Sequence, residues 1–380
     1  MTSKPKTLNP EIYKQTRLPL LEADTMPTEC YTSQEFYNLE TKKIFHKVWN
    51  FVGRADLVPE IGDYYAFDFT DVPILIVRGD DNQIRAFANS CRHRGAKIAS
   101  GEGNCNAFSC PYHGWTYSLE GHLKAATYMD RTKGFNKENY GLVQLRLDQW
   151  GGFLFLCFDN NAESLETFLG DLPQLMQPYD LDRLTCTRRQ EYSLKCNWKI
   201  YIENAMESYH VPWVHNKTLQ KQKRDHNPPI LPINGEYSGL LTRHKGSRAL
   251  LPGMEGFPYI PTLTGDSAEG TYYILINPST MLGCTFDTVW WLELHPEGPE
   301  QTKLIVGSCF HETTTGRDDF DHIVQNYYKR LDISIVEDNE ISELQQAGLR
   351  SPFAQPGRFS YMEPLVHVID NWVLDRVLGD

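Results

Sequence analysis

Residues 91–117, CRHRGAKIASGEGNCNAFSCPYHGWTY, contain two pairs of side chains that commonly bind metals. The first pair is Cys91 and His93, and the second pair is Cys110 and His113. Tetrahedral zinc is the commonest use of two cysteines and two histidines. A zinc finger of this kind normally pairs cysteine with cysteine and histidine with histidine, whereas each pair here is mixed. The spacing therefore predicts a metal site that differs from a zinc finger.

The mixed pairs suit a cluster with two irons, one bound by both cysteines and the other by both histidines. This is the ligand set of a Rieske [2Fe–2S] centre. The segment CPYHGWTY adds Pro111 and Gly114 for a tight turn whose backbone N–H groups can face the cluster sulfurs. Structural zinc stays open as the alternative, and it would make the chain a zinc-stabilised, non-enzymatic binding protein. Cys105 and His122 lie outside the pattern and are predicted to be structural.

Short β-rich runs surround these pairs. The runs VWNFV, DYYAFDF, VPILIV and IRAFA alternate with turn clusters between residues 48 and 90. Such alternation is typical of a small antiparallel all-β unit, so the two pairs should lie in loops between strands. The run WGGFLFLCF, residues 150–158, should be the closing strand. We predict an N-terminal segment over residues 1–46 and an all-β domain over residues 47–160.

The rest of the chain, residues 161–380, predicts an α+β domain around an antiparallel sheet, on which the N-terminal segment should pack. A helical segment near 163–176 precedes a strand, and a helix should begin near Asn197. The runs GTYYILIN, DTVWWLELHP and TKLIVGSCF should be strands, followed by a long helix from about 318 to 349 and a closing helix. Residues 219–270 are rich in glycine, proline and charge, and are predicted to form long loops over a cavity.

Composition excludes several other classes of protein. The 380 residues carry a formal net charge of −12, and the sequence has no run rich in lysine and arginine. Both features argue against a general nucleic-acid-binding protein. No stretch approaches the roughly 20 apolar residues of a membrane span, and the N-terminus lacks the apolar core of a signal peptide. Nine cysteines, an odd number, do not suggest a disulfide framework, so a cytoplasmic location is expected.

A second group of metal ligands lies in NWKIYIENAMESYHVPWVH, residues 197–215. On one continuous helix, at about 100° per residue, a polar face would contain Glu203, Glu207 and His210. A solvated face is the simpler interpretation, but Pro212 should disrupt the helix just after His210. A bend at that point would let His210 and His215 converge on one ion. The zinc-hydrolase motif H-E-x-x-H is absent.

Two histidines still need an anionic third ligand. The predicted helix over 318–349 has an apolar stripe made of Phe320, Val324, Tyr327, Leu331 and Ile335. Asp338 continues this stripe, and a carboxylate on a buried face is costly unless a cation or hydrogen bonds compensate it. Glu337 and Glu340 project away from the stripe. Asp338 with His210 and His215 would form the two-histidine, one-carboxylate triad of non-haem Fe(II) oxygenases.

Both motifs, in this order, resemble those of the Rieske non-haem iron oxygenases, in their α (terminal oxygenase) subunit. The resemblance rests on CRHRG, CPYHGWTY, the NW-x-x-x-x-EN segment, a carboxylate three residues before the first histidine, and the late ED pair. It implies a Rieske cluster, a mononuclear Fe(II) and reductive activation of O₂. The chain has no G-x-G-x-x-G fingerprint and no four-cysteine ferredoxin set. Electrons would therefore come from a separate flavin and iron–sulfur reductase that draws on NAD(P)H.

The resemblance also implies a head-to-tail homo-oligomer, commonly a trimer, in which the cluster of one subunit lies beside the mononuclear iron of the next. Carried over by position, Glu207 would join His113 of one subunit to His210 of its neighbour. A carboxylate there would orient both imidazoles.

Glu207 also bears on the substrate, because ring-hydroxylating dioxygenases of this family usually have Asp at that position. Glu within ENAMESYH resembles the branch that oxidises choline, carnitine or glycine betaine, which implies monooxygenation of a quaternary ammonium compound by N-demethylation or C–N cleavage. Ring hydroxylation of an aromatic acid stays the alternative. An aromatic cage would suit the cation, and its candidates are Tyr209, Trp213, Tyr272, Tyr273, Phe286, Trp290 and Trp291. Candidate anchors for a carboxylate are Arg243, Lys245 and Arg248.

Overall fold

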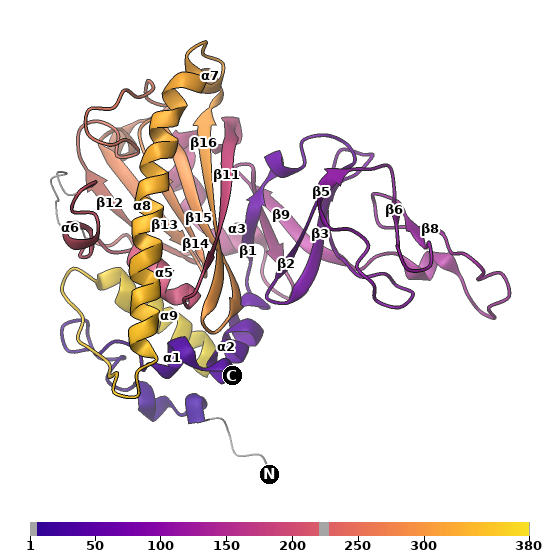
Figure 1. Cartoon of the computed structure of the whole chain (residues 1–380), viewed down its shortest axis with the longest axis horizontal. Helices are drawn as coiled ribbons and strands as arrows, with labels where there is room; N and C mark the ends of the chain where they lie inside the picture. Colours follow the sequence, from indigo (N-terminus) through magenta and orange to yellow (C-terminus); the bar gives the residue numbers. More distant parts are fainter. Residues whose placement is uncertain (1–5, 220–227, 380) are drawn as a thin grey trace. The chain divides into compact units, whose positions relative to one another are not determined.

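The computed structural model describes residues 6–219 and 228–379 of the 380-residue chain (Figure 1). The chain divides into two compact units. One unit is Val48–Ala162, and the other combines Met1–Lys47 with Glu163–Asp380. The predicted loop region over 219–270 falls partly on residues 220–227, which lie outside the described part.

The unit over Val48–Ala162 is all-β, as its alternating pattern predicts. Its main sheet is antiparallel with the order β1-β10-β9-β4-β3-β2-β5. The strands of this sheet are β1 (Asn50–Arg54), β2 (Asp63–Phe69), β3 (Val72–Arg78), β4 (Ile84–Ala88), β5 (Gly101–Asn104), β9 (Gln144–Trp150) and β10 (Phe153–Cys157). A smaller sheet contains β6 (Phe108–Ser109), β7 (Thr116–Tyr117) and β8 (Leu123–Ala125). The segment with the two cysteine–histidine pairs runs from the end of β4 to β7.

The second unit is built on a six-stranded antiparallel sheet with the order β11-β16-β15-β14-β13-β12. Its strands are β11 (Leu184–Leu194), β12 (Tyr237–Arg243), β13 (Gly270–Ile276), β14 (Thr280–Cys284), β15 (Val289–Gly298) and β16 (Gln301–His311). Two glycines make room for large rings, because a Cβ atom would lie 2.3 Å from Trp290 at Gly283 and 2.1 Å from Trp291 at Gly307. These close approaches let the tryptophans of β15 lie flat on the neighbouring strands.

The helices of this unit are α1 (Glu29–Thr32), α2 (Gln34–Glu40), α3 (Leu165–Leu169), α4 (Leu172–Met176), α5 (Trp198–Ala205), α6 (Val211–Val214), α7 (Glu312–Thr315), α8 (Phe320–Leu349) and α9 (Pro364–Leu378). The long helix α8 lies against the sheet, where Tyr327 packs on Phe310 of β16 with ring centroids 5.1 Å apart (Figure 1). The predicted apolar stripe of α8 is its packing face. No helix in the described ranges is both long and apolar enough to cross a membrane.

The N-terminal segment packs on α5 through a buried ion pair. The Nζ atom of Lys199 lies 2.5 Å from Oε1 of Glu40, and both side chains are fully buried. Trp198 donates a second hydrogen bond to this carboxylate, at 3.3 Å. Removal of one partner of such a pair would leave an uncompensated buried charge.

Three local expectations were wrong. The helix that begins after Asn197 ends at Ala205, before Glu207 and His210, so these residues do not share a helix face with Glu203. Pro212 does not end that helix but stands in the first turn of α6, where its missing N–H costs nothing. The region over 219–270 also contains β12, and β14 was not predicted. Neither strand shows a clear alternation of polar and apolar residues, and β14 has only five residues.

Glu203 is buried rather than solvated. Its burial should make the free energy of unfolding depend on pH. Burial raises the pKa of Glu203 to about 7, and burial also raises the pKa of the neighbouring Asp370. A carboxyl group whose pKa is higher in the folded state costs stability as the pH rises from its unfolded pKa, about 4.3, toward 7. We expect the free energy of unfolding to fall over this window by roughly 3 kcal/mol. Glu203→Gln should flatten the fall, measured by urea unfolding, and the exposed Glu166→Gln should not.

Candidate metal centres

The two cysteine–histidine segments form loops of the same design. The backbone carbonyl of Cys91 accepts a hydrogen bond from Gly95 N–H at 2.8 Å, and the carbonyl of Cys110 accepts one from Gly114 N–H at 3.0 Å. Gly95 and Gly114 have φ of +77° and +70°, which strongly favours glycine. Two sequence segments separated by β5 and β6 thus present a cysteine and a histidine from equivalent turns.

The four donors of these loops are sorted by type. The side chains of Cys91 and Cys110 are buried within an apolar cluster, whereas His93 is exposed and His113 half-buried. The Nδ1 atoms of the two imidazoles lie 3.1 Å apart. Two nitrogen ligands on one metal, each about 2.1 Å from it, would be separated by about 3 Å. The two cysteine sulfurs are buried, and the two imidazoles lie together nearer the surface. This arrangement fits a cluster in which one iron is bound by the cysteines and the other by the histidines.

Tyr117, the last residue of CPYHGWTY, belongs to this site, although no role was predicted for it. Its hydroxyl oxygen accepts the N–H of Arg92 at 3.0 Å and lies 3.2 Å from Sγ of Cys91. The hydroxyl proton is therefore available to the sulfur. Burial raises the pKa of the Cys91 thiol, but hydrogen bonds from Tyr117 and from the backbone of His93 outweigh it, and the pKa is lowered overall. A stabilised thiolate is the form that binds metals.

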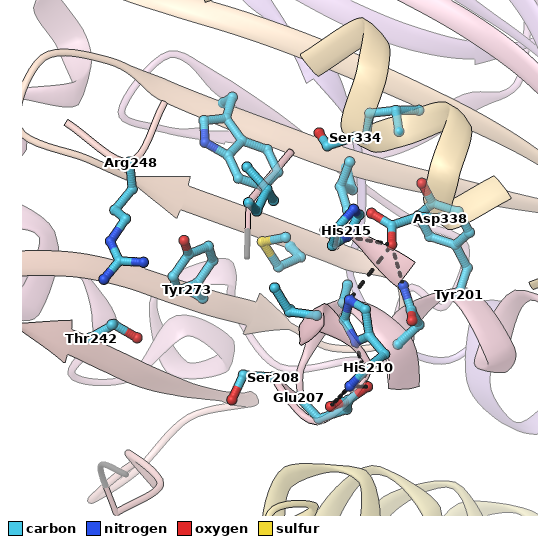
Figure 2. A pocket seen from close by; sticks show the side chains of 18 of the residues that line it. Tyr201, Glu207, Ser208, His210, His215, Thr242, Arg248, Tyr273, Ser334 and Asp338 are labelled. Carbon is cyan, nitrogen blue, oxygen red and sulfur yellow. Dashed lines mark hydrogen bonds and ion pairs between the residues drawn. The ribbon is translucent and has the colours of Figure 1, made fainter. Parts of the chain in front are cut away.

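The second site brings together the three residues predicted for it. One side-chain donor from each of His210, His215 and Asp338 lies within 4.8 Å of the others (Figure 2). The Nε2 atoms lie 3.6 Å (His210) and 3.1 Å (His215) from Oδ1 of Asp338. Ligands at about 2.1 Å and 90° around one ion would be about 3 Å apart. The donor set and its spacing fit a mononuclear iron.

Two further carboxylates hold the outer sides of the imidazoles. Glu207 lies 2.5 Å from Nδ1 of His210, and Glu337 lies 2.6 Å from Nδ1 of His215. Both rings therefore turn Nε2 toward Asp338, as metal-binding histidines commonly do. Burial lowers the pKa of His215, but Asp338 and Glu337 outweigh it, and the pKa is raised overall.

The structure separates Asp338 from its two neighbours in the sequence. Glu337 reaches the back of a histidine, and Glu340 is exposed. Asn204, from the end of α5, donates a hydrogen bond to Oδ1 of Asp338 at 3.0 Å. Neither Asn204 nor Glu337 was predicted to act in the site. Their roles depend on how α5 and α6 approach α8, which local periodicity does not contain.

A pocket opens beside these ligands, between the sheet and α8 (Figure 2). Of the aromatic candidates, Tyr273 and Trp290 line it. Tyr209 and Trp213 do not line it, and they are exposed by 51% and 77%. Among the candidate anchors only Arg248 lines the pocket, whereas Arg243 pairs with Asp266 and Glu269 on the surface.

Known proteins match both units. Residues 181–379 match the family described as ring hydroxylating alpha subunit (catalytic domain), and residues 48–136 match the Rieske [2Fe-2S] domain. The choline monooxygenase of Beta vulgaris is 28% identical over 94% of this chain and 78% of its own length. The glycine betaine monooxygenase oxygenase subunit of Chromohalobacter salexigens is 28% identical over 93% of this chain and 86% of its own length. The carnitine monooxygenase oxygenase subunit of Acinetobacter baumannii is 36% identical over 49% of this chain and 51% of its own length.

Solved structures agree with this assignment. A quaternary ammonium Rieske monooxygenase in complex with L-carnitine aligns with a TM-score of 0.77 and 25% identity, over 93% of this chain and 96% of that one. A naphthalene 1,2-dioxygenase from Rhodococcus sp. shares the fold, with a TM-score of 0.78 and 20% identity, over 94% of this chain and 95% of that one. The predicted fold class is confirmed, and the matches give no support to a zinc-stabilised binding protein. The chain belongs to the ring-hydroxylating alpha subunit family and is a Rieske-type oxygenase, an oxidoreductase.

Proposed function

We propose that this chain is a terminal oxygenase that uses O₂ and electrons from a separate reductase to monooxygenate a quaternary ammonium compound. The observation that carries the proposal is the convergence of His210, His215 and Asp338 at one end of the pocket. The similarity to choline, glycine betaine and carnitine monooxygenases supports the substrate class.

In this proposal residues 47–160 form the cluster domain, residues 161–380 form the catalytic domain, and residues 1–46 pack on the latter. Cys91, His93, Cys110 and His113 would hold the [2Fe–2S] cluster. His210, His215 and Asp338 would hold Fe(II). When bound, the cluster supplies single electrons and the iron supplies O₂ activation.

The chain's own residues enclose the substrate and orient the two histidines. Oxygenation inserts one oxygen atom of O₂ into a C–H bond beside the nitrogen, and the other atom leaves as water, with two electrons and two protons consumed. The hydroxylated carbon then separates from nitrogen as an aldehyde, leaving a tertiary amine and a proton. Met281, Leu292 and Ile335 give the pocket an apolar wall that excludes water. Glu207 and Glu337 keep the imidazoles aimed at the reacting end.

The proposal extends to the oligomer and to the source of electrons. Glu207, which contacts His210 in its own chain, would also contact His113 of a neighbouring subunit in a head-to-tail trimer. Electrons would come from NAD(P)H through a flavin and iron–sulfur reductase. The similarity to proteins called oxygenase subunits supports a separate reductase.

Oxygen uptake tests the proposed function. Purified protein with a surrogate reductase and NADH should consume O₂ faster when choline, glycine betaine or carnitine is added, and an aldehyde should accumulate. Benzoate should have no such effect. Stimulation by benzoate alone, with a cis-diol product, would replace the proposal with ring hydroxylation. Turnover without O₂ or reductant would indicate a hydrolase.

A pair of cysteine variants tests the cluster ligands. Cys110→Ser should abolish the visible colour, the inorganic sulfide and the electron paramagnetic resonance (EPR) signal of reduced protein, because a thiolate ligand is lost. Cys105→Ser is the matched control, since Cys105 packs against the same apolar cluster as Cys110 but lies outside the ligand pattern. Loss of the signal in both variants, or in neither, would contradict the assignment.

A further inference from the structure

A loop of the second unit, residues 244–257, contributes to the wall of the pocket. It follows β12, and its residue Arg248 lines the pocket (Figure 2). Leu250 and Phe257 of this loop pack in one apolar cluster with Tyr327 of α8. The place of Arg248 on the pocket wall therefore depends on what holds the loop against α8.

A buried carboxylate holds the beginning of this loop. Asp287 lies in the turn between β14 and β15 and is only 1% exposed. It accepts hydrogen bonds from three hydroxyl groups, which are Oγ1 of Thr285 at 2.9 Å, Oγ of Ser247 at 2.8 Å and the hydroxyl of Tyr327 at 2.5 Å. These groups belong to the turn, the loop and α8. A buried carboxylate is costly unless hydrogen bonds compensate it, so Asp287 needs the loop and the helix in place.

The hydroxyl of Tyr327 extends this attachment to the end of the loop. Burial and the charge of the neighbouring Asp287 raise the pKa of Tyr327. The hydroxyl therefore stays protonated and donates to Asp287, while its oxygen accepts the backbone N–H of Phe257 at 2.7 Å. Near the beginning of the loop, Oγ of Ser247 accepts the N–H of Ala249 at 3.0 Å. Two hydroxyl groups thus connect one carboxylate to both ends of the loop.

The attachment at the end of the loop leaves no room for a side chain. A Cβ atom at Gly256 would lie 2.8 Å from the hydroxyl oxygen of Tyr327 and 2.4 Å from Cδ1 of Leu250. Such contacts would force the loop or these side chains to move. The backbone of the loop is therefore packed directly on Tyr327, in addition to its hydrogen bond.

Asp287 does more than close its own turn. Thr285 supplies one hydroxyl from within the turn, whereas Ser247 and Tyr327 are each 40 residues away along the chain. A turn residue without a wider role needs only partners of the first kind. The two distant partners connect the sheet, the loop and α8 at one point.

We infer that Asp287 is a positioning residue for the pocket: through Ser247 and Tyr327 it holds the 244–257 loop against α8 and so fixes Arg248 on the pocket wall. The inference rests on the proposed function only in taking this pocket as the substrate site. Release of the loop leaves the candidate iron ligands in place, because none of them belongs to it. Release should therefore weaken substrate binding more than it slows the reaction of bound substrate.

Hydrogen exchange and limited proteolysis of the metal-loaded protein test the attachment without any substrate. Asp287→Asn and Tyr327→Phe should each raise the exchange rate of the Phe257 amide by about 10- to 100-fold. Trypsin cleavage after the half-buried Arg248 should accelerate to a similar extent. Cleavage after Lys245, which is already exposed, should change little.

Steady-state kinetics connect the loop to the substrate. With the surrogate reductase and NADH, Asp287→Asn and Tyr327→Phe should raise KM for carnitine, choline or glycine betaine about 10-fold and leave kcat within about twofold. Thr285→Val is the matched control, because it removes the hydroxyl that belongs to the turn, and it should behave as wild type in all three measurements. Unchanged iron content and circular dichroism show that the variants fold, and Tyr327→Phe carries the test if Asp287→Asn does not.

The outcomes separate this inference from the proposed function. A loop as protected in Asp287→Asn and Tyr327→Phe as in wild type would overturn the inference, and so would an unchanged KM in variants whose loop is released. Equal effects of Thr285→Val would also overturn it. Release of the loop by both variants, in a protein that turns over none of the three compounds, would support the attachment and overturn the proposed substrate class.

Discussion

Asp338→Ala should remove the mononuclear iron and abolish turnover, while the colour and EPR signal of the Rieske cluster remain. Asp338 is the only anionic member of the three-donor group, and its Oδ1 lies within 3.6 Å of both imidazole Nε2 atoms. Loss of a partner that only orients a metal ligand typically lowers metal affinity 10- to 100-fold, so loss of the carboxylate ligand itself should exceed about 100-fold. Iron content after gel filtration and O₂ uptake measure the two effects.

Two neighbours on α8 are matched controls for Asp338. Glu340→Ala removes an exposed carboxylate of the same helix and should change neither iron content nor turnover. Glu337→Ala removes the group behind His215 and should lower iron affinity within the 10- to 100-fold range. Retention of iron in Asp338→Ala together with its complete loss in Glu337→Ala would identify Glu337 as the ligand.

Glu207→Gln should lower electron transfer from the cluster to the iron by orders of magnitude with both metals bound. In its own chain Glu207 holds Nδ1 of His210 at 2.5 Å, and the proposed second contact joins it to His113 of a neighbouring subunit. The loss of one hydrogen bond to a charged group typically costs about 1.5–3 kcal/mol, which is about 10- to 150-fold in rate. A larger fall would mean that the carboxylate controls the transfer step beyond orienting the ring.

Glu337→Gln is the control for Glu207→Gln, because Glu337 makes the same contact with the other histidine but has no proposed bridging role. With iron restored by loading, Glu337→Gln should transfer electrons at close to the normal rate. Stopped-flow oxidation of the prereduced cluster by O₂, in the presence of carnitine, measures both variants. Normal single-turnover kinetics in Glu207→Gln, with an intact oligomer, would exclude the bridge.

Residues with distinct chemistry could be placed from the sequence, whereas the residues that support them could not. The mixed pairs around Cys91 and Cys110 limited the possible metals by ligand type alone. The helical period of α8 put Asp338 on a buried face, and that face does pack on the sheet. Periodicity is a local property, so it succeeds where a single element decides the outcome.

The errors occurred where distant segments decide the outcome. The end of α5 at Ala205 depends on the chain turning toward α8, and an isolated helical pattern does not show it. Asn204, Tyr117 and Glu337 act through contacts with residues on other elements. Arg330 lines the pocket but was not predicted to do so. An arginine on a long helix is usually solvated, and only the packed structure shows that this one is buried.

The central claim is that this chain oxygenates its substrate with its own two metal sites, and single turnover tests it most directly. Protein loaded with about three irons per chain, two in the cluster and one mononuclear, would be chemically reduced, freed of reductant and mixed with O₂ and carnitine. The account predicts rapid cluster oxidation that depends on carnitine, and aldehyde in an amount approaching one per reduced site. Fully loaded, reduced protein that yields no oxidised product from carnitine, γ-butyrobetaine, glycine betaine, choline or benzoate would contradict it.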